Sequence, residues 1–333
     1  MPSVQLFAFN NSIAKELKER ITPALFTGPM GKTVDGAFVP FVPSAYQQRY
    51  FDWLQTGKGS ALVKAVAGSG KTTTIVNGLR YTGAASHEVN ASTFHSAGLY
   101  PLSKHLGVKS RDLVIDGSKV RKLAREALGD VERETYADFA VRLVALAKGQ
   151  GIGPLTPDVP EAWYGLIRHH DLYLEEEGAT EERAIEIARD LLARSNEAAK
   201  RKFIDFDDML YLPRLWRLRL WQNDWVFIDE AQDTNPVRRA LAKLALKPGG
   251  RLVAVGDPKQ AIYGFTGASH DAMDLIAREF NCVELPLTVS YRCPKVIAER
   301  VRRIVPYFEV PETAREGEVL ELPVADAVSR LDA

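Results

Sequence analysis

The stretch Trp225-Val226-Phe227-Ile228-Asp229-Glu230-Ala231-Gln232-Asp233 indicates the fold class of this chain. Its apolar first part predicts a buried parallel strand, which would bring the following acids to the carboxyl edge of an open α/β sheet, where such sheets bind ligands. There Asp229 can hold Mg²⁺, directly or through water, and Glu230 can orient or deprotonate an attacking water. Because two adjacent acids are also common on solvated surfaces, this assignment needs a phosphate-binding loop elsewhere in the chain.

A phosphate-binding loop lies earlier in the chain, between a predicted strand at residues 61–66 and a predicted helix at residues 73–80. Its glycines let several backbone N–H groups face one anion, and the start of the helix adds a favourable field. Lys71 would reach the β- and γ-phosphates of ATP, and the Thr72 hydroxyl would bind Mg²⁺. The usual first glycine of the Walker pattern is Ala65 here. The residues expected to cradle the nucleotide are Ala67, Gly68, Ser69, Gly70, Lys71, Thr72 and Thr73.

Further motifs follow in a specific order. They are Thr93-Phe94-His95-Ser96, Gly256-Asp257-Pro258-Lys259-Gln260-Ala261-Ile262-Tyr263-Gly264 and Ser290-Tyr291-Arg292. Together with the loop and the acids, they resemble the superfamily 1 DNA helicases of the UvrD/Rep type, over about residues 47–292. The resemblance implies an α/β, RecA-like P-loop NTPase core, a parallel sheet flanked by helices, with an inserted helical accessory domain. It also implies ATP and Mg²⁺ as ligands, and single-stranded or partly duplex DNA as the partner.

The resemblance assigns nucleotide contacts by position. Gln47 matches the glutamine that reads adenine, with Gln48 as the adjacent alternative, and Tyr291 matches the aromatic ring that stacks on the base. Gln260 matches the γ-phosphate sensor. Arg292 matches an arginine that reaches the γ-phosphate from the second motor domain. Many members carry an arginine directly after the loop's Lys-Thr, where this chain has Thr73.

DNA contacts are expected where aromatic rings stand in the motifs, because bases of a single strand stack on such rings. The resemblance implies that Phe94, His95, Tyr263 and Phe265 contact the strand, although each ring alone could equally be a packing residue.

One family element is missing from its usual place. In the family, an apolar strand, a Phe-Asn turn and a helix lie between the phosphate loop and the Thr-Phe-His-Ser motif. That interval is too short here, but residues 4–18 at the amino terminus, which include Phe9, resemble the missing element. We expect this relocated strand to enter the same sheet and Phe9 to lie near the edge formed by residues 93–95, contacting DNA; an unrelated terminal β-α unit is the alternative.

The amino-acid composition excludes few classes of protein. The 333 residues are enough for two or three domains, and 43 basic residues balance 43 acidic ones, so a DNA-binding face would need segregated charge. Cys282 and Cys293 suit a reducing compartment, and the absence of a signal-peptide pattern or membrane-length apolar run predicts a cytoplasmic protein of a bacterium or a phage-infected host.

The domain order is expected to be discontinuous. Residues 1–98 would form the first part of the ATP-binding domain (1A), with residues 1–42 holding the relocated element, and residues 99–202 the helical accessory domain (1B). Residues 203–284 would complete domain 1A, and residues 285–333 would begin domain 2A, with a helix at 294–305 and a strand at 319–322. Arg214, Trp216, Arg217, Arg219 and Trp221 interleave charge and ring, for which helix packing with arginines extended to solvent is the favoured interpretation.

Two function classes stay open. The first is an ATP-driven DNA translocase and helicase with 3′-to-5′ polarity. The later motifs of domain 2A are not recognisable, so a fragment, a truncated product or one part of an assembly is expected. The second class is therefore an ATP-responsive binder of single-stranded DNA with little unwinding, completed by a missing segment or a protein partner.

Overall fold

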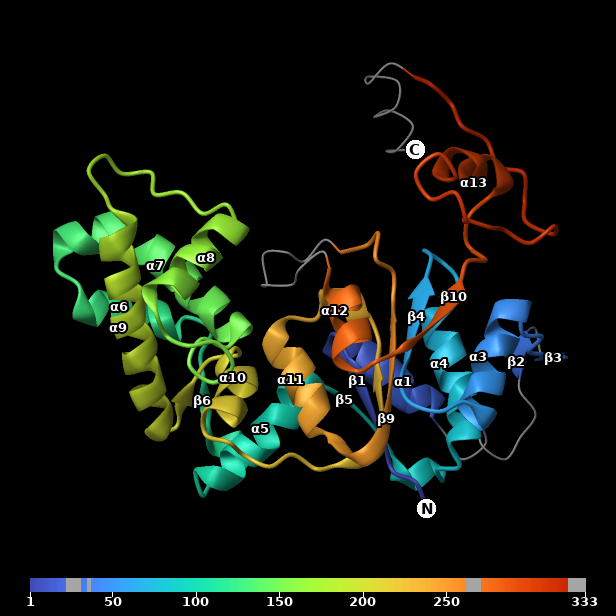
Figure 1. The fold of residues 1–333 in the computed structure, drawn as a ribbon, viewed down its shortest axis with the longest axis horizontal. Helices are drawn as coiled ribbons and strands as arrows, with labels where there is room; N and C mark the ends of the chain where they lie inside the picture. Colours follow the sequence, from blue (N-terminus) through green and yellow to red (C-terminus); the bar gives the residue numbers. More distant parts are fainter. Residues whose placement is uncertain (22–30, 35–36, 262–270, 323–333) are drawn as a thin grey trace.

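The computed structural model describes residues 1–21, 31–34, 37–261 and 271–322. Its centre is a six-stranded sheet whose neighbouring strands all run parallel, in the order β10-β4-β9-β8-β1-β5 (Figure 1). The strands are β1 (Val4–Ala8), β4 (Ala61–Ala65), β5 (Val89–Thr93), β8 (Asn223–Ile228), β9 (Leu246–Gly256) and β10 (Val283–Leu287). The predicted α/β fold with a parallel sheet is confirmed.

Both faces of the sheet are covered by helices. Trp225 and Phe227 of β8 pack into one apolar cluster, and Val226 and Ile228 pack into another, because successive strand residues point to opposite faces. The first cluster is covered by α1 (Asn11–Arg20), α3 (Ala45–Thr56) and α4 (Lys71–Gly78). The second is covered by the start of α5 (Phe94–His105), α10 (Asp208–Leu215), α11 (Pro236–Leu244) and α12 (Ala272–Glu279). Burial on both faces explains why this strand is an unbroken apolar run.

A separate helical domain lies beside the sheet (Figure 1). It is built from α6 (Lys119–Ala127), α7 (Asp130–Gln150), α8 (Pro160–His169) and α9 (Glu181–Lys200), and the two-stranded pair β6 (Val114–Ile115) and β7 (Phe203–Ile204) closes its base. Its core also contains Leu102 from α5 and Tyr211 and Leu212 from α10. The helical domain therefore reaches past the expected boundaries at residues 98 and 202, since α5 and α10 each serve both cores.

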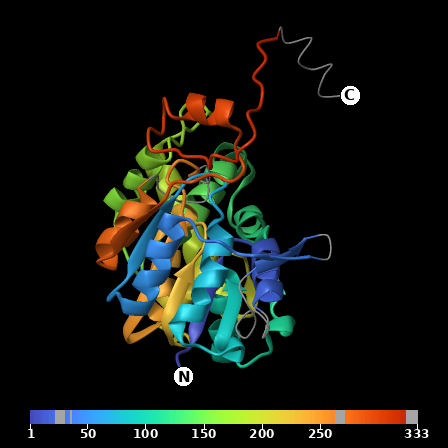
Figure 2. The same cartoon turned by 90° about the vertical axis from the view of Figure 1, so that its right-hand side faces the viewer.

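Smaller elements complete the chain. They are the antiparallel hairpin β2 (Gly31–Val34) and β3 (Ala37–Pro40), and the 3₁₀ turns η1 (Leu79–Thr82), η2 (Ser86–Glu88), η3 (Ser110–Asp112) and η4 (Ala231–Asp233). The hairpin projects from the molecule in Figure 2. Within the described ranges, no helix combines the length and the apolar character needed to cross a membrane.

The C-terminal segment, residues 288–322, packs on the phosphate-binding loop. Its helix α13 (Lys295–Val301) contributes Ala298 to a small apolar cluster with Val305, Phe308 and Val66, the residue just before the loop. In Figure 2 this segment lies at the opposite end of the molecule from the N-terminus. Residues 319–322 form no strand, contrary to expectation, because no neighbouring strand among the described residues pairs with them.

The expected domain boundary at residue 285 falls inside a strand of the core sheet, so it is wrong at this point. Residues 283–287 form β10, which pairs with β4 and is an edge of the core sheet. Leu287 is buried, while Val283 and Glu284 are exposed, as suits a strand with a neighbour on one side only.

The N-terminal strand enters the core sheet as expected. β1 lies between β8 and β5, with Ala8 opposite Thr93 and Phe7 opposite Ile228. The Asn10 side chain then caps α1 by accepting a hydrogen bond from the Ile13 N–H at 2.9 Å. The structure thus places Phe9 next to the edge at residues 93–95; that the element has been relocated within the family stays a proposal.

Candidate nucleotide and nucleic-acid site

Three consecutive threonines anchor the first turn of α4 to three different elements. Thr72 Oγ1 donates to Asp229 Oδ2 at 3.1 Å, after β8. Thr73 Oγ1 accepts from Arg20 Nη2 at 3.0 Å, on α1, and Thr74 Oγ1 accepts from Gln47 Nε2 at 2.9 Å, on α3. The helix that follows the phosphate-binding loop is therefore held in position from three sides.

Two glycines give this loop its shape. Gly68 and Gly70 have φ of +74° and +79°, a left-handed conformation that side chains disfavour. A Cβ on Gly68 would lie 2.6 Å from the Arg292 Cβ, so the loop and the C-terminal segment approach too closely for any other residue. The Tyr291 N–H also donates to the Gly68 carbonyl at 2.9 Å. Both expected nucleotide contacts from the C-terminal segment, Tyr291 and Arg292, thus lie beside the loop with exposed side chains.

The acids lie opposite the loop, as predicted. Lys71 Nζ forms an ion pair with Glu230 Oε2 at 2.8 Å and lies 3.5 Å from Gln260 Oε1. Glu230 itself has φ of +52°, a strained conformation for a non-glycine residue and one that is concentrated at functional sites. Residues that follow β8 and β9 are therefore brought together with the loop that follows β4.

Gln232 braces the acidic strand end. Its Nε2 donates to Glu230 Oε2 at 2.8 Å, while its Oε1 accepts from the Asp257 N–H at 3.0 Å, after β9. The side chain is almost fully buried, so it fixes the distance between Glu230 and the neighbouring strand end that carries Gln260.

The hydroxyl of Thr72 and the carboxylate of Asp229 suit Mg²⁺, which prefers hard oxygen ligands and keeps most of its sites for water and phosphate. Burial, and then the nearby charge of Glu230, raise the pKa of Asp229 to about 6. Burial raises the pKa of Asp233 to about 6 in the same way. A buried carboxylate that is costly to ionise without a cation is the kind of group that a divalent ion would stabilise.

Gln47 is 2% exposed, and its amide is already bonded within the chain. Besides the bond to Thr74, its Oε1 accepts from the Ser44 N–H at 3.0 Å. The side chain lies beside α4, the helix that follows the loop. To bond to adenine, its amide would have to give up the hydrogen bonds to Ser44 and Thr74. Its role stays a prediction.

The aromatic residues expected to contact DNA divide into three groups. Phe94 is 4% exposed and stacks on Phe7 with ring centroids 4.2 Å apart, so in this structure the ring belongs to the core between α5 and the sheet, and its contact with DNA stays a prediction. Phe9 and His95 remain partly exposed at the carboxyl ends of β1 and β5. Tyr263 and Phe265 lie outside the described residues.

Two residues that sequence reasoning missed complete this surface. Phe206 is 56% exposed and lies edge-on to His95, with ring centroids 6.5 Å apart. Arg238 is buried, lies 4.9 Å from the centroid of the Phe9 ring and donates to the Asp233 carbonyl at 2.9 Å. Arg238 therefore links the aromatic surface to the acids of the nucleotide site; nothing in its sequence context indicated this.

Arg20 was also missed. Its guanidinium reaches Thr73 from α1 and pairs with Glu16 at 3.1 Å. Where many family members carry an arginine after Lys-Thr, this chain has Thr73. The guanidinium of Arg20 nevertheless lies against Thr73, so a guanidinium is present at this place in the fold. No local pattern could show this, because the two residues are 53 positions apart.

We expect His95 to make the folded protein sensitive to acid. Burial, and then the Arg238 charge, lower the pKa of His95 to about 4, against 6.5 as the ordinary value. Between these values the unfolded chain binds a proton that the folded chain does not, so stability falls as pH falls from 6.5 toward 4. At pH 5 this difference in proton binding lowers the free energy of unfolding by about 2 kcal/mol relative to neutral pH. Urea unfolding at pH 7 and pH 5 should show a smaller loss for His95→Gln than for the wild type; equal losses would contradict this.

Comparison with known proteins agrees with this geometry. The sequence profile described as UvrD/REP helicase N-terminal domain matches residues 80–281. A probable DNA helicase II homolog of Mycoplasma capricolum is 28% identical over 220 residues, covering 62% of this chain and 29% of that protein. The ATP-dependent DNA helicase PcrA of Leuconostoc citreum is 21% identical over 297 residues, covering 76% of this chain and 38% of that protein. The ATP-dependent DNA helicase Rep of Salmonella typhimurium is 35% identical over 98 residues, covering 27% and 14%.

This chain therefore spans well under half of the length of the relatives that it matches. The match nevertheless extends over more than half of the chain, from η1 to the turn just before β10. By its fold, its motifs and this match, the chain belongs to the UvrD/REP helicase N-terminal domain family.

Proposed function

We propose that this chain couples the hydrolysis of Mg-ATP to movement along single-stranded DNA, as the ATP-binding part of a superfamily 1 helicase. The observation that carries the proposal is the meeting of Lys71, Glu230 and Gln260 beside the Thr72–Asp229 pair. A phosphate cradle, a carboxylate base and a candidate metal site at one sheet edge are the parts that phosphoryl transfer to water needs. The names of the relatives, ATP-dependent DNA helicases, support the same reaction.

The proposed chemistry assigns a step to each side chain. Bound phosphates would compete with Glu230 for the ammonium of Lys71, and the freed carboxylate would accept the proton of an attacking water. Thr72 and Asp229 would hold Mg²⁺, which neutralises charge on the phosphate oxygens when bound. Arg292, whose backbone lies against the loop, would add a guanidinium to the γ-phosphate.

ATP hydrolysis would be coupled to DNA movement through contacts that join the acids to the aromatic surface. Gln260 lies next to Lys71, and Arg238 joins Asp233 to Phe9, so a shift of the strand ends on hydrolysis would reach the rings that hold bases. We propose 3′-to-5′ movement from the family resemblance.

The test is steady-state ATP hydrolysis by this chain with increasing single-stranded DNA. We expect DNA to stimulate wild-type turnover, and Lys71→Ala to reduce turnover by roughly 10²–10³-fold because it removes charge stabilisation of the transferring phosphoryl group. Lys58→Ala, an exposed lysine before β4, should behave as the wild type. Wild-type protein that binds DNA and ATP without stimulated turnover would instead favour an ATP-responsive DNA binder.

A further inference from the structure

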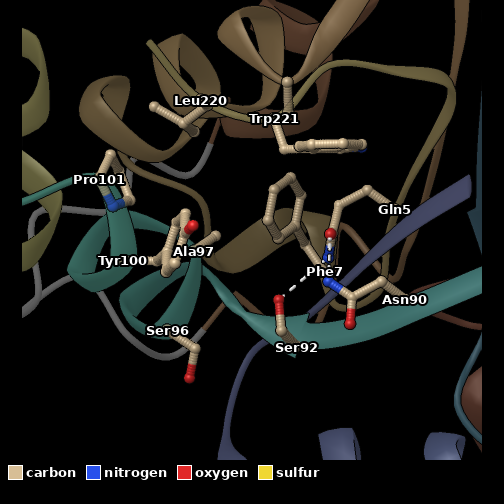
Figure 3. A pocket seen from close by; sticks show the side chains of 11 residues that line it. Gln5, Phe7, Asn90, Ser92, Ser96, Ala97, Tyr100, Pro101, Leu220 and Trp221 are labelled. Atoms are coloured by element: carbon tan, nitrogen blue, oxygen red, sulfur yellow. Dashed lines mark hydrogen bonds between the residues drawn. The ribbon is translucent and has the colours of Figure 1, made fainter. Parts of the chain in front are cut away.

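A pocket of about 240 Å³ lies beside β5, one of the two edge strands of the core sheet (Figure 3). Its walls come from β1, β5, α5 and the segment between α10 and β8, together with Ala245 after α11. None of the residues assigned above to ATP or DNA lines this pocket; Phe7, the stacking partner of Phe94, is one of its lining residues.

One wall of the pocket is polar and held in place. Gln5 Nε2 donates to Ser92 Oγ at 3.0 Å, and Asn90 Nδ2 donates to Gln5 Oε1 at 2.8 Å. Gln5 is 6% exposed, so this chain of amides and hydroxyls is fixed by the sheet rather than by solvent. The Asn90 carbonyl and the Ser92 proton can still bond to the polar edge of a ligand.

The opposite side carries large, exposed aromatic rings. Trp221 is 81% exposed and Tyr100 is 65% exposed, and Figure 3 shows them approaching the polar wall from two different segments. The sequence favoured helix packing for the rings before β8. This is right for Trp216, whose ring lies 5.1 Å from that of His105, but not for Trp221. A tryptophan that the fold leaves in water next to a built pocket is typical of a binding surface.

Cations accompany these rings. Arg217 and Arg219 are exposed just before Trp221, and Lys104 is exposed one helical turn after Tyr100. The acid nearest in sequence to Trp221, Asp224, is already paired with Lys247 at 2.8 Å. The two segments that carry the rings thus also carry exposed positive charge, in a chain whose net charge is zero.

We propose that this pocket takes a base of single-stranded nucleic acid, with Trp221 and Tyr100 stacking on it and Arg217 and Arg219 contacting the adjoining phosphates. The proposal rests on the proposed function, and it adds a second DNA contact on the flank of the sheet. An apolar peptide would use the rings but neither the fixed amides nor the cations, whereas a nucleotide uses all three. A DNA strand held here as well as at Phe9 and His95 would contact the protein both beside β5 and at the carboxyl end of β5.

The test is the affinity for an oligothymidine series of increasing length, measured by fluorescence anisotropy. Wild-type affinity should keep rising with length after the strand has filled the surface at Phe9 and His95. Trp221→Ala should remove this later gain and bind the longest strand at least about fivefold more weakly, since one stacked base is lost. Trp221→Phe should keep most of the gain. Tyr173→Ala, which truncates a ring of similar exposure in the helical domain, should match the wild type.

Photo-cross-linking with bromodeoxyuridine-substituted strands locates the contact independently. We expect cross-linked peptides to contain Trp221 or Tyr100 in addition to the surface at His95. Cross-links at His95 alone, with unchanged affinity of Trp221→Ala, would overturn the flank site while leaving the proposed function intact. Failure of the wild type to bind any strand would overturn both.

Discussion

Replacing Glu230 with glutamine is expected to lower ATP turnover by about 10²–10⁴-fold, the usual contribution of a positioned general base. The amide keeps the size of the side chain, and its oxygen can still accept from Gln232, so the strained turn at residue 230 should be retained. Because the lost group acts on water and not on the nucleotide, the affinity for ATP should stay near that of the wild type.

Steady-state turnover and equilibrium binding of an ATP analogue separate these two effects. Glu182→Gln, an exposed glutamate at the start of α9, is the matched control and should keep full turnover. Turnover that survives Glu230→Gln would show that another group activates the water, and the assignment of Glu230 as base would fail.

Replacing Asp208 with alanine is expected to destabilise the helical domain by about 3–5 kcal/mol. Asp208 is fully buried and pairs with Lys119 at 2.6 Å and Lys148 at 2.8 Å, and both lysines are themselves buried. Burial raises the pKa of Asp208, but the two ammonium groups outweigh it and hold that pKa below its ordinary value. Without this carboxylate, Asp205 alone would face two buried cations.

The midpoint of urea unfolding, followed by circular dichroism, measures this loss. Asp190→Ala is the control, because its ion pair with Arg194 in the same domain is half exposed and such pairs contribute little. A midpoint for Asp208→Ala close to that of Asp190→Ala would mean that the cluster does not stabilise the fold. The cluster also joins α6 and α7 to α10, so its loss should loosen the helical domain from the core.

The parts of the site that the sequence predicted are those whose chemistry is local. A glycine-rich loop between strand and helix and two acids after an apolar run are contiguous patterns, and the structure brings Lys71, Thr72, Asp229 and Glu230 together. The same holds for the N-terminal strand, whose apolar run and following asparagine cap predicted a β-α unit that joins the sheet.

The parts that the sequence missed depend on residues far apart in the chain. Arg20 meets Thr73, and Arg238 meets Phe9, only because the sheet order brings α1 and α11 to those places. The burial of Phe94 was missed for the same reason: its motif position suggested an exposed ring, but the insertion of β1 beside β5 supplies Phe7 as a stacking partner and buries it. Trp221 was expected to pack against a helix but is exposed, and no local sequence pattern shows this.

The central claim, that the loop and the acids form one Mg-nucleotide site, is tested most directly by a crystal structure with Mg²⁺ and a non-hydrolysable ATP analogue. We predict that Mg²⁺ will lie between Thr72, Asp229 and the phosphates, that Lys71 will have left Glu230 for the β- and γ-phosphates, and that Glu230 will face the γ-phosphate through a water. A nucleotide bound away from the loop, or Lys71 still paired with Glu230 beside a bound triphosphate, would contradict it.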